Sequence, residues 1–105
     1  MNYEKTKQPC VRVDLFFSQA VDDDFMIIFK ERNVAQKYTK TVGVQGNGEK
    51  NPKLGDAIWP QLNNIMTIFC SEEEAAKIED IVLEMRKRYP VEGIGCFTSR
   101  AEALV

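Results

Sequence analysis

Residues 71–95, SEEEAAKIEDIVLEMRKRYPVEGIG, decide the fold, because they describe one long helix and the turn that follows it. Ser71 and Glu74 stand at capping-box spacing, in which the serine oxygen accepts from a backbone N–H group and the glutamate reaches back. Apolar residues then recur every three or four positions, at Ala75, Ile78, Ile81, Val82, Met85 and Tyr89. The basic run 86–88 suits either the negative end of a helix dipole or a binding patch, and Pro90 ends the helix.

Strands flank this helix on both sides. Residues 64–70 are almost continuously apolar, which predicts a strand in the middle of a sheet. Residues 93–98 predict a short last strand. The Gly93-Ile94-Gly95 stretch that begins it is either a plain turn or a backbone cradle for phosphate.

The first half of the chain has the same order of elements. Residues 11–17 alternate, with Val11, Val13, Leu15 and Phe17 on one face, which predicts a half-buried strand. Residues 22–32 fit a buried strand or a helix. We predict a helix, because three aspartates precede the apolar run and two basic residues close it. Val21, Phe25, Ile28 and Phe29 would share its buried face. Residues 37–44, rich in β-branched side chains, predict the second strand.

The order strand, helix, strand, strand, helix, strand predicts an α+β protein of ferredoxin-like βαββαβ topology. Such a fold has a four-stranded antiparallel sheet with two helices on one face, and here a long loop joins the second and third strands. The length of 105 residues fits one domain. We expect that domain to span residues 11–105, after a flexible N-terminal lead at residues 1–10.

Composition excludes several classes of partner. A net charge of -2 gives no electrostatic footprint for nucleic acid or an anionic membrane. Residues 64–70 also lack the glycine-aromatic pattern of RNA-recognition domains, which share this topology. No apolar run is long enough for membrane insertion, and the N-terminus lacks the apolar stretch of a signal peptide. We therefore expect a cytoplasmic protein that binds no nucleic acid.

The residue types also argue against an enzyme. The chain has no histidine, which removes Ser-His and Cys-His nucleophiles and most zinc sites. Residues 22–24 are three aspartates, but consecutive residues at a helix start point in different directions, so we expect no metal site. Cys10, Cys70 and Cys96 form no pair motif, which predicts small buried side chains.

Residues 45–63 form a loop far longer than a hairpin needs, and loops of this length are often functional. Glycines and prolines interrupt it at residues 46, 48, 52, 55 and 60. Lys50 and Lys53 are cations that could meet an anion. Trp59, the only tryptophan, either covers the sheet edge or anchors an interface with another subunit or partner.

In element order, loop position and two glycine pairs, residues 11–100 resemble the PII-like superfamily, which comprises PII nitrogen-regulatory signalling proteins and their CutA-like relatives. In PII proteins a Gly-x-Gly opens a long effector loop, and Gly46-Asn47-Gly48 matches it. A second Gly-x-Gly-Lys lines an ATP/ADP cleft between subunits of a trimer, and Gly93-Ile94-Gly95 matches that pair. Cys96 stands where that lysine would be, and the basic residues after the last strand reduce to Arg100.

The resemblance implies a trimeric regulatory protein rather than an enzyme. It would sense a small anionic ligand, with ATP, ADP or another adenine nucleotide as the candidate, at inter-subunit clefts. It would regulate a protein partner (an enzyme, transporter or regulator) through residues 45–63. The implied ligand-binding residues are Gly46, Gly48, Lys50, Gly93, Gly95 and Arg100, with Trp59 at an interface. The alternative is a CutA-like trimeric interaction module without nucleotide binding.

Overall fold

The computed structural model describes residues 4–48, 52–57 and 61–105. Its elements in chain order are β1 (Lys7–Ser18), the short 3₁₀ helix η1 (Gln19–Val21), α1 (Asp22–Glu31), β2 (Thr39–Val44), β3 (Asn63–Cys70), α2 (Glu72–Arg88) and β4 (Gly95–Leu104). The predicted helix at residues 22–32 and the predicted order of elements along the chain are both confirmed.

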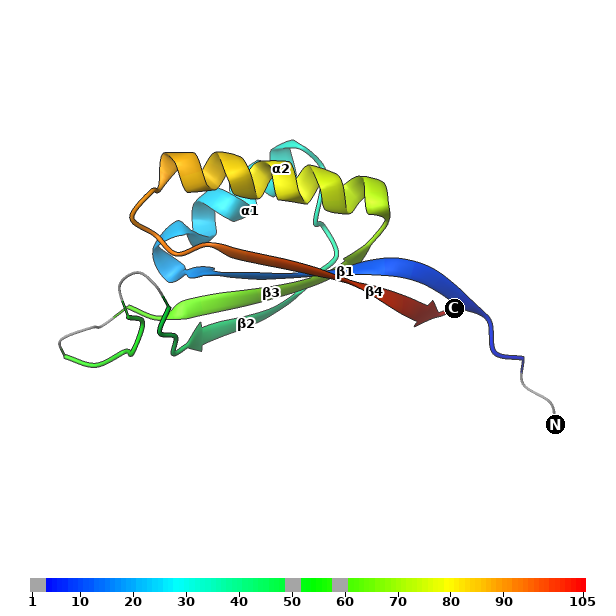
Figure 1. The fold of residues 1–105 in the computed structure, drawn as a ribbon, viewed down its shortest axis with the longest axis horizontal. Coiled ribbons are helices and arrows are strands. Elements are labelled where there is room, and N and C mark those ends of the chain that lie inside the picture. Colours follow the sequence, from blue (N-terminus) through cyan, green and yellow to red (C-terminus); the bar gives the residue numbers. More distant parts are fainter. Residues whose placement is uncertain (1–3, 49–51, 58–60) are drawn as a thin grey trace.

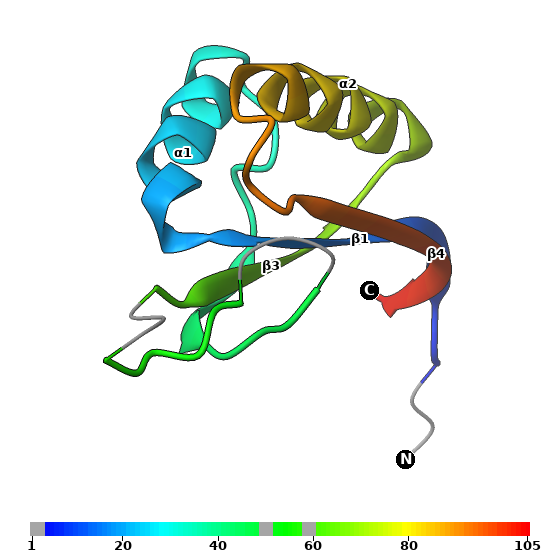
Figure 2. The same cartoon turned by 60° about the vertical axis from the view of Figure 1, so that its left-hand side comes forward.

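The four strands form one antiparallel sheet in the order β2-β3-β1-β4. Both helices cover the same face of this sheet, as Figures 1 and 2 show. The predicted ferredoxin-like architecture is therefore confirmed. The loop between β2 and β3 lies at the same end of the molecule as the turn between α2 and β4, whereas the two termini lie at the other end (Figure 1).

Two strands are longer than the sequence pattern predicts. β1 begins at Lys7, four residues earlier than predicted, and β4 continues to Leu104, six residues further than predicted. The extensions pair with each other, Lys7 opposite Leu104, which satisfies backbone groups that neither strand could satisfy alone. β4 begins at Gly95, so Gly93 and Ile94 belong to the preceding turn.

The core fills the layer between the sheet and the helices. The predicted inward faces are confirmed: Val13, Leu15 and Phe17 of β1 are fully buried, and Val11 is partly buried. The helices contribute Phe25, Ile28, Phe29, Ala75, Ile78, Ile81, Val82 and Met85. Cys70 and Cys96 pack partly buried against this core, as expected for small apolar side chains. Burial, together with Glu74 and Cys10, raises the pKa of Cys70 to about 11.

One detail of the α2 cap is corrected. Ser71 Oγ accepts a hydrogen bond from the Glu74 N–H at 3.1 Å, as predicted. The Glu74 carboxylate, however, accepts from the backbone N–H of Ala35 at 3.1 Å. Ala35 has a φ of 53° in the connection between α1 and β2, so tertiary contact gives Glu74 a partner from another element.

The other face of the sheet bears no helix and exposes aromatic side chains. Phe16 on β1, Phe69 on β3 and Phe97 on β4 are 36%, 54% and 63% exposed. Phe16 and Phe97 meet edge to face with ring centroids 5.7 Å apart, and the Arg12 guanidinium lies 5.8 Å from the centre of the Phe69 ring. We call this surface the open face. Among the described residues, no helix has both the length and the apolar character needed to cross a membrane.

Candidate functional site

A groove of about 800 Å³ lies where the loop between β2 and β3 meets the turn between α2 and β4. It brings together both glycine pairs, Gly46-Asn47-Gly48 and Gly93-Ile94-Gly95, although they lie in different halves of the sequence. We call it the glycine groove. Phe16, Lys53, Asn63, Arg86, Glu92 and Phe97 complete its described lining.

The loop reaches the groove through a short piece of paired backbone. The backbone N–H of Gly46 donates to the Lys53 carbonyl, and the backbone N–H of Lys53 donates to the Gly46 carbonyl, both at 2.7 Å. The side-chain amide of Gln45 donates to the Leu54 carbonyl at 3.0 Å. This pairing fixes the backbone of Lys53 beside Gly46, and thereby places the lysine at the groove.

A buried polar cluster supports the same end of the sheet. Asn64, 4% exposed, accepts from the Gly43 N–H at 3.0 Å and from the Gln19 amide at 3.2 Å. Its own amide donates to Asp22 at 2.8 Å, and Lys40 forms an ion pair with the same carboxylate at 2.9 Å. Gly43 has a φ of 74° at the irregularity in β2, so this cluster stabilises the point where β2 turns into the loop.

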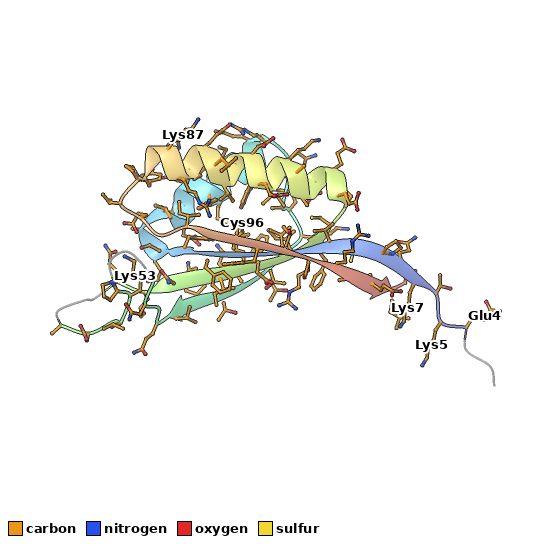
Figure 3. All side chains as sticks on the ribbon, viewed as in Figure 1. Glu4, Lys5, Lys7, Lys53, Lys87 and Cys96 are labelled. Carbon is orange, nitrogen blue, oxygen red and sulfur yellow. The ribbon has the colours of Figure 1, made fainter. Side chains whose placement is uncertain are left out.

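Lys53 and Glu92 form the charged centre of the groove. Lys53 Nζ lies 3.6 Å from Glu92 Oε2, and the two side chains are only 8% and 17% exposed. This distance permits Coulomb attraction but exceeds that of a hydrogen bond. Within the described part of the chain, Glu92 Oε2 is buried without a hydrogen-bond partner. Figure 3 shows Lys53 at the loop end of the sheet.

The turn at Gly93–Gly95 is held from α2. Arg86 donates to the Ile94 carbonyl through Nε at 3.0 Å and Nη2 at 2.8 Å. Arg86 thus binds the turn and also adds positive charge to the groove. A Cβ atom built on Gly93 would meet no atom within 4 Å, so the backbone there faces open space. Another group can approach that backbone closely.

Cys96 does not line the groove. Its side chain packs against the core, on the helix-covered face of β4, as Figure 3 indicates. Burial, with the negative charge of Glu79 nearby, raises the pKa of its thiol above the usual value. At this end of the molecule the loop supplies the cation Lys53 and α2 supplies Arg86, whereas the residue after the glycine pair supplies no charge.

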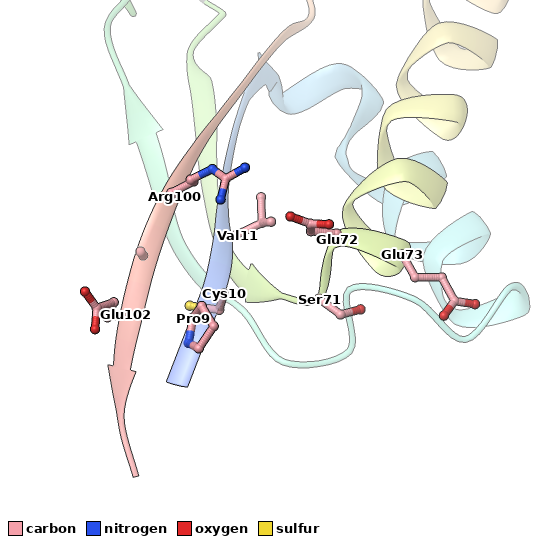
Figure 4. A pocket seen from close by; sticks show the side chains of 9 residues that line it. Pro9, Cys10, Val11, Ser71, Glu72, Glu73, Arg100 and Glu102 are labelled. Atoms are coloured by element: carbon pink, nitrogen blue, oxygen red, sulfur yellow. The ribbon is translucent and has the colours of Figure 1, made fainter. Parts of the chain in front are cut away.

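The structure places Arg100 elsewhere. It lies five residues beyond Gly95 on β4, which at ~3.4 Å per residue is about 17 Å along the strand. There it lines a second hollow of about 890 Å³, between the outer ends of β1 and β4 and the start of α2 (Figure 4). We call this the terminal hollow; its lining comprises residues 9–11, 71–73 and 100–102.

The two cavities differ in charge. The described lining of the glycine groove has two cations, Lys53 and Arg86, and one carboxylate. The terminal hollow has, among the described residues, one cation, Arg100, and three carboxylates, from Glu72, Glu73 and Glu102. An anion is therefore attracted to the groove and repelled from the hollow.

Of the predicted site residues, Gly46, Gly48, Gly93 and Gly95 lie together, and Arg100 of the same chain does not join them. Lys50 and Trp59 lie outside the described residues. The sequence pattern assigned no site role to Phe16 or Phe97. For Arg86 it allowed two roles, a cation at the helix end or part of a binding patch. Only the alternation of β1, which turns Phe16 away from the core, pointed to one of these side chains.

No protein-family model matches the sequence, and the search of curated proteins gave no match. Among solved structures, the chain is similar to CPII, a nitrogen-regulatory PII-like protein from Thiomonas intermedia bound to ADP, AMP and bicarbonate. The TM-score is 0.71 at 11% identity, over 93% of this chain and 91% of that one.

A second similar structure is a protein from Thermus thermophilus that is assigned to the PII-like signalling proteins. Its TM-score is 0.67 at 20% identity, over 92% of this chain and 90% of that chain. The apo form of CPII gives a TM-score of 0.62 at 9% identity, over 95% and 99% of the two chains. The resemblance drawn from element order and glycine pairs is confirmed at the level of architecture: this chain has the PII-like fold.

Proposed function

We propose that this chain is a PII-like regulatory protein that senses a small anionic ligand in the glycine groove. An adenine nucleotide is the first candidate ligand, because the similar CPII structure holds ADP and AMP. The protein would act as a signalling component, passing the ligand-bound state to a partner protein, and not as an enzyme.

The observation that supports this function most directly is the meeting of both glycine pairs in one groove. Glycine backbone lets phosphate oxygens approach N–H groups that a side chain would otherwise screen. The open space beside Gly93 and Gly48 and the positive balance of the lining both suit an anion.

We further propose a homotrimer built through the open face. Three exposed phenylalanines on one sheet surface form the kind of apolar patch that usually meets another protein. Phe16 and Phe97 belong both to this face and to the groove lining, so a copy packed there would border the ligand. Arg100 would then reach a groove only from a neighbouring copy, since it is about 17 Å from Gly95 in its own chain.

The loop of residues 45–63 is the proposed contact with the partner protein. Its described base pairs through Gly46 and Lys53, and these residues line the groove. A ligand held there would touch the loop directly and change which loop conformation is populated, which is an established form of switching. The partner would be an enzyme, transporter or regulator that recognises the loop.

The ligand is tested by isothermal titration of the protein with ATP, ADP and AMP, together with the Arg100→Ala variant. We expect saturable binding of at least one nucleotide and weaker binding after Arg100→Ala. If none of the three nucleotides gives a binding signal, nucleotide sensing is refuted and the CutA-like interaction module remains. The Glu92 carboxylate inside the groove favours that alternative.

The assembly is tested by light scattering on Phe69→Glu, with Leu83→Glu as its control. Both side chains are similarly exposed, 54% and 53%, but Leu83 lies on α2, away from the open face. We expect wild type and Leu83→Glu at about three times the 12.0 kDa chain mass, and Phe69→Glu at the mass of one chain. A monomeric wild type would refute the trimer.

A further inference from the structure

We propose that Glu92 is a built-in competitor for the ligand. Before a ligand binds, its carboxylate neutralises Lys53, so that only a ligand with a doubly charged terminal phosphate displaces it. This inference rests on the proposed function and specifies the class of ligand. Nucleoside mono-, di- and triphosphates belong to that class, and cyclic nucleotides, whose phosphate carries one charge, do not.

The first argument is the poor satisfaction of Glu92. Its Oε2 is buried and, among the described residues, has no hydrogen-bond partner, and the Lys53 ammonium is 3.6 Å away. A buried carboxylate oxygen without a hydrogen bond is unfavourable. The pair is therefore held by Coulomb attraction alone, and it can be exchanged for a better-matched anion.

The second argument is the position of Lys53. Its side chain is only 8% exposed, and its backbone is fixed by two hydrogen bonds to Gly46. The ammonium group is consequently directed at the groove whether or not a ligand is present. A phosphate offers it several oxygens at hydrogen-bond distance, which the Glu92 carboxylate does not achieve here.

The third argument is that Glu92 has room to leave. It stands in the turn between α2 and β4, beside Val91, which is 69% exposed, and Gly93, whose missing side chain leaves open space. Its backbone N–H donates to the Tyr89 carbonyl at 3.1 Å, so the backbone stays fixed. A change of side-chain rotamer is enough to take the carboxylate out to solvent.

Charge counting then sets the threshold. A ligand with one negative charge replaces the carboxylate one for one, and gains little electrostatic energy at Lys53. A terminal phosphate carries about -1.5 to -2 charges near neutral pH, so the same exchange is favourable. Arg86, the other cation of the described lining, also attracts the more highly charged ligand more strongly, so it acts in the same direction as Lys53.

The experiment compares ADP, cyclic AMP and inorganic pyrophosphate by titration against wild type and Glu92→Gln. In wild type we expect ADP to bind and cyclic AMP to give no measurable binding. In Glu92→Gln we expect the affinities for ADP and pyrophosphate to rise about tenfold, and cyclic AMP binding to become measurable, because the competing charge is gone. Glu102→Gln, which removes a carboxylate from the terminal hollow, should behave as wild type.

The double variant Lys53→Gln/Glu92→Gln identifies the cation. It leaves neither charge of the Lys53–Glu92 pair unpaired, so its melting temperature should stay close to that of wild type. The gain in affinity for ADP and pyrophosphate that Glu92→Gln shows should disappear. A gain that persists without Lys53 would overturn the inference. So would unchanged or weaker binding of ADP and pyrophosphate in Glu92→Gln, or equally tight binding of cyclic AMP and ADP in wild type.

These outcomes separate the inference from the proposed function. If neither protein binds ADP but Glu92→Gln binds pyrophosphate more tightly than wild type, nucleotide sensing fails while the competition by Glu92 stands. If ADP binds and Glu92→Gln changes nothing, nucleotide sensing stands and the competition fails.

Discussion

The glycine groove and the terminal hollow have similar volumes, about 800 and 890 Å³, and lie at opposite ends of β1 and β4. Among the described residues, three carboxylates and one guanidinium line the hollow, whereas two cations and one carboxylate line the groove. The described lining of the groove also contains glycine backbone that faces open space, at Gly48 and Gly93. Size therefore does not identify an anion site; charge and access to the backbone do.

The two ends also differ in what holds them. Buried side-chain hydrogen bonds around Asn64 stabilise the groove end, while backbone pairing holds the extensions of β1 and β4 together at the terminal end. Side chains such as Gln8 and Glu102 are exposed there. A change of side chain should therefore matter more at the groove end.

The largest expected effect comes from Asn64→Ala. It removes the acceptor of the Gly43 N–H and the donor to Asp22, both at a buried position. Unsatisfied buried groups of this kind cost about 2–3 kcal/mol of unfolding free energy in total. The melting temperature should fall by roughly 10–20 °C, as measured by circular dichroism. Gln8→Ala at the terminal end should change it little, and equal effects of the two variants would contradict the difference between the ends.

Gly93→Ala should have the next largest effect, and on binding only. The new methyl group meets no protein atom within 4 Å, and Gly93 does not have a positive φ. Stability should be unchanged or slightly higher, because alanine restricts the unfolded chain. The methyl group would occupy ligand space, so ADP affinity should fall about tenfold, or about 1.4 kcal/mol. Unchanged affinity in titration would show that the ligand does not approach this turn.

The smallest effect on ADP binding is expected from Glu72→Gln/Glu73→Gln in the terminal hollow. Loss of two acids from the first turn of α2 weakens the helix dipole interaction by about 0.3–1 kcal/mol each. ADP affinity should stay within about twofold of wild type, since these carboxylates lie at the other end of β1 and β4. If nucleotide binding appears or strengthens substantially in this variant, the terminal hollow and not the groove is the anion site.

Much of the fold was predictable from local patterns. The alternation of β1 and the 3.6-residue period of α2 report which side of each element is buried, and those buried faces are observed. The ends of β1 and β4 were not predictable, because neither extension is apolar enough to form a pattern alone. They exist because Lys7 to Cys10 pair with Ala101 to Leu104.

The candidate site was predictable only in part. The glycine pairs were found because spacing is visible in the sequence. The placement of Lys53 opposite Glu92, of Arg86 on the Ile94 carbonyl, and of Arg100 among carboxylates depends on which elements meet. None of these relations has a local signature.

The sequence by itself determined the helices, the central strands and their buried faces, because the burial of an amphipathic face depends on residues a few positions apart. The tertiary structure decided the partner of each charge. Lys53 and Glu92 come from different loops, and Glu74 bonds to Ala35 instead of completing its own cap. Coulomb attraction and hydrogen bonding act over a few ångströms in space, and the folded chain alone sets which groups come that close.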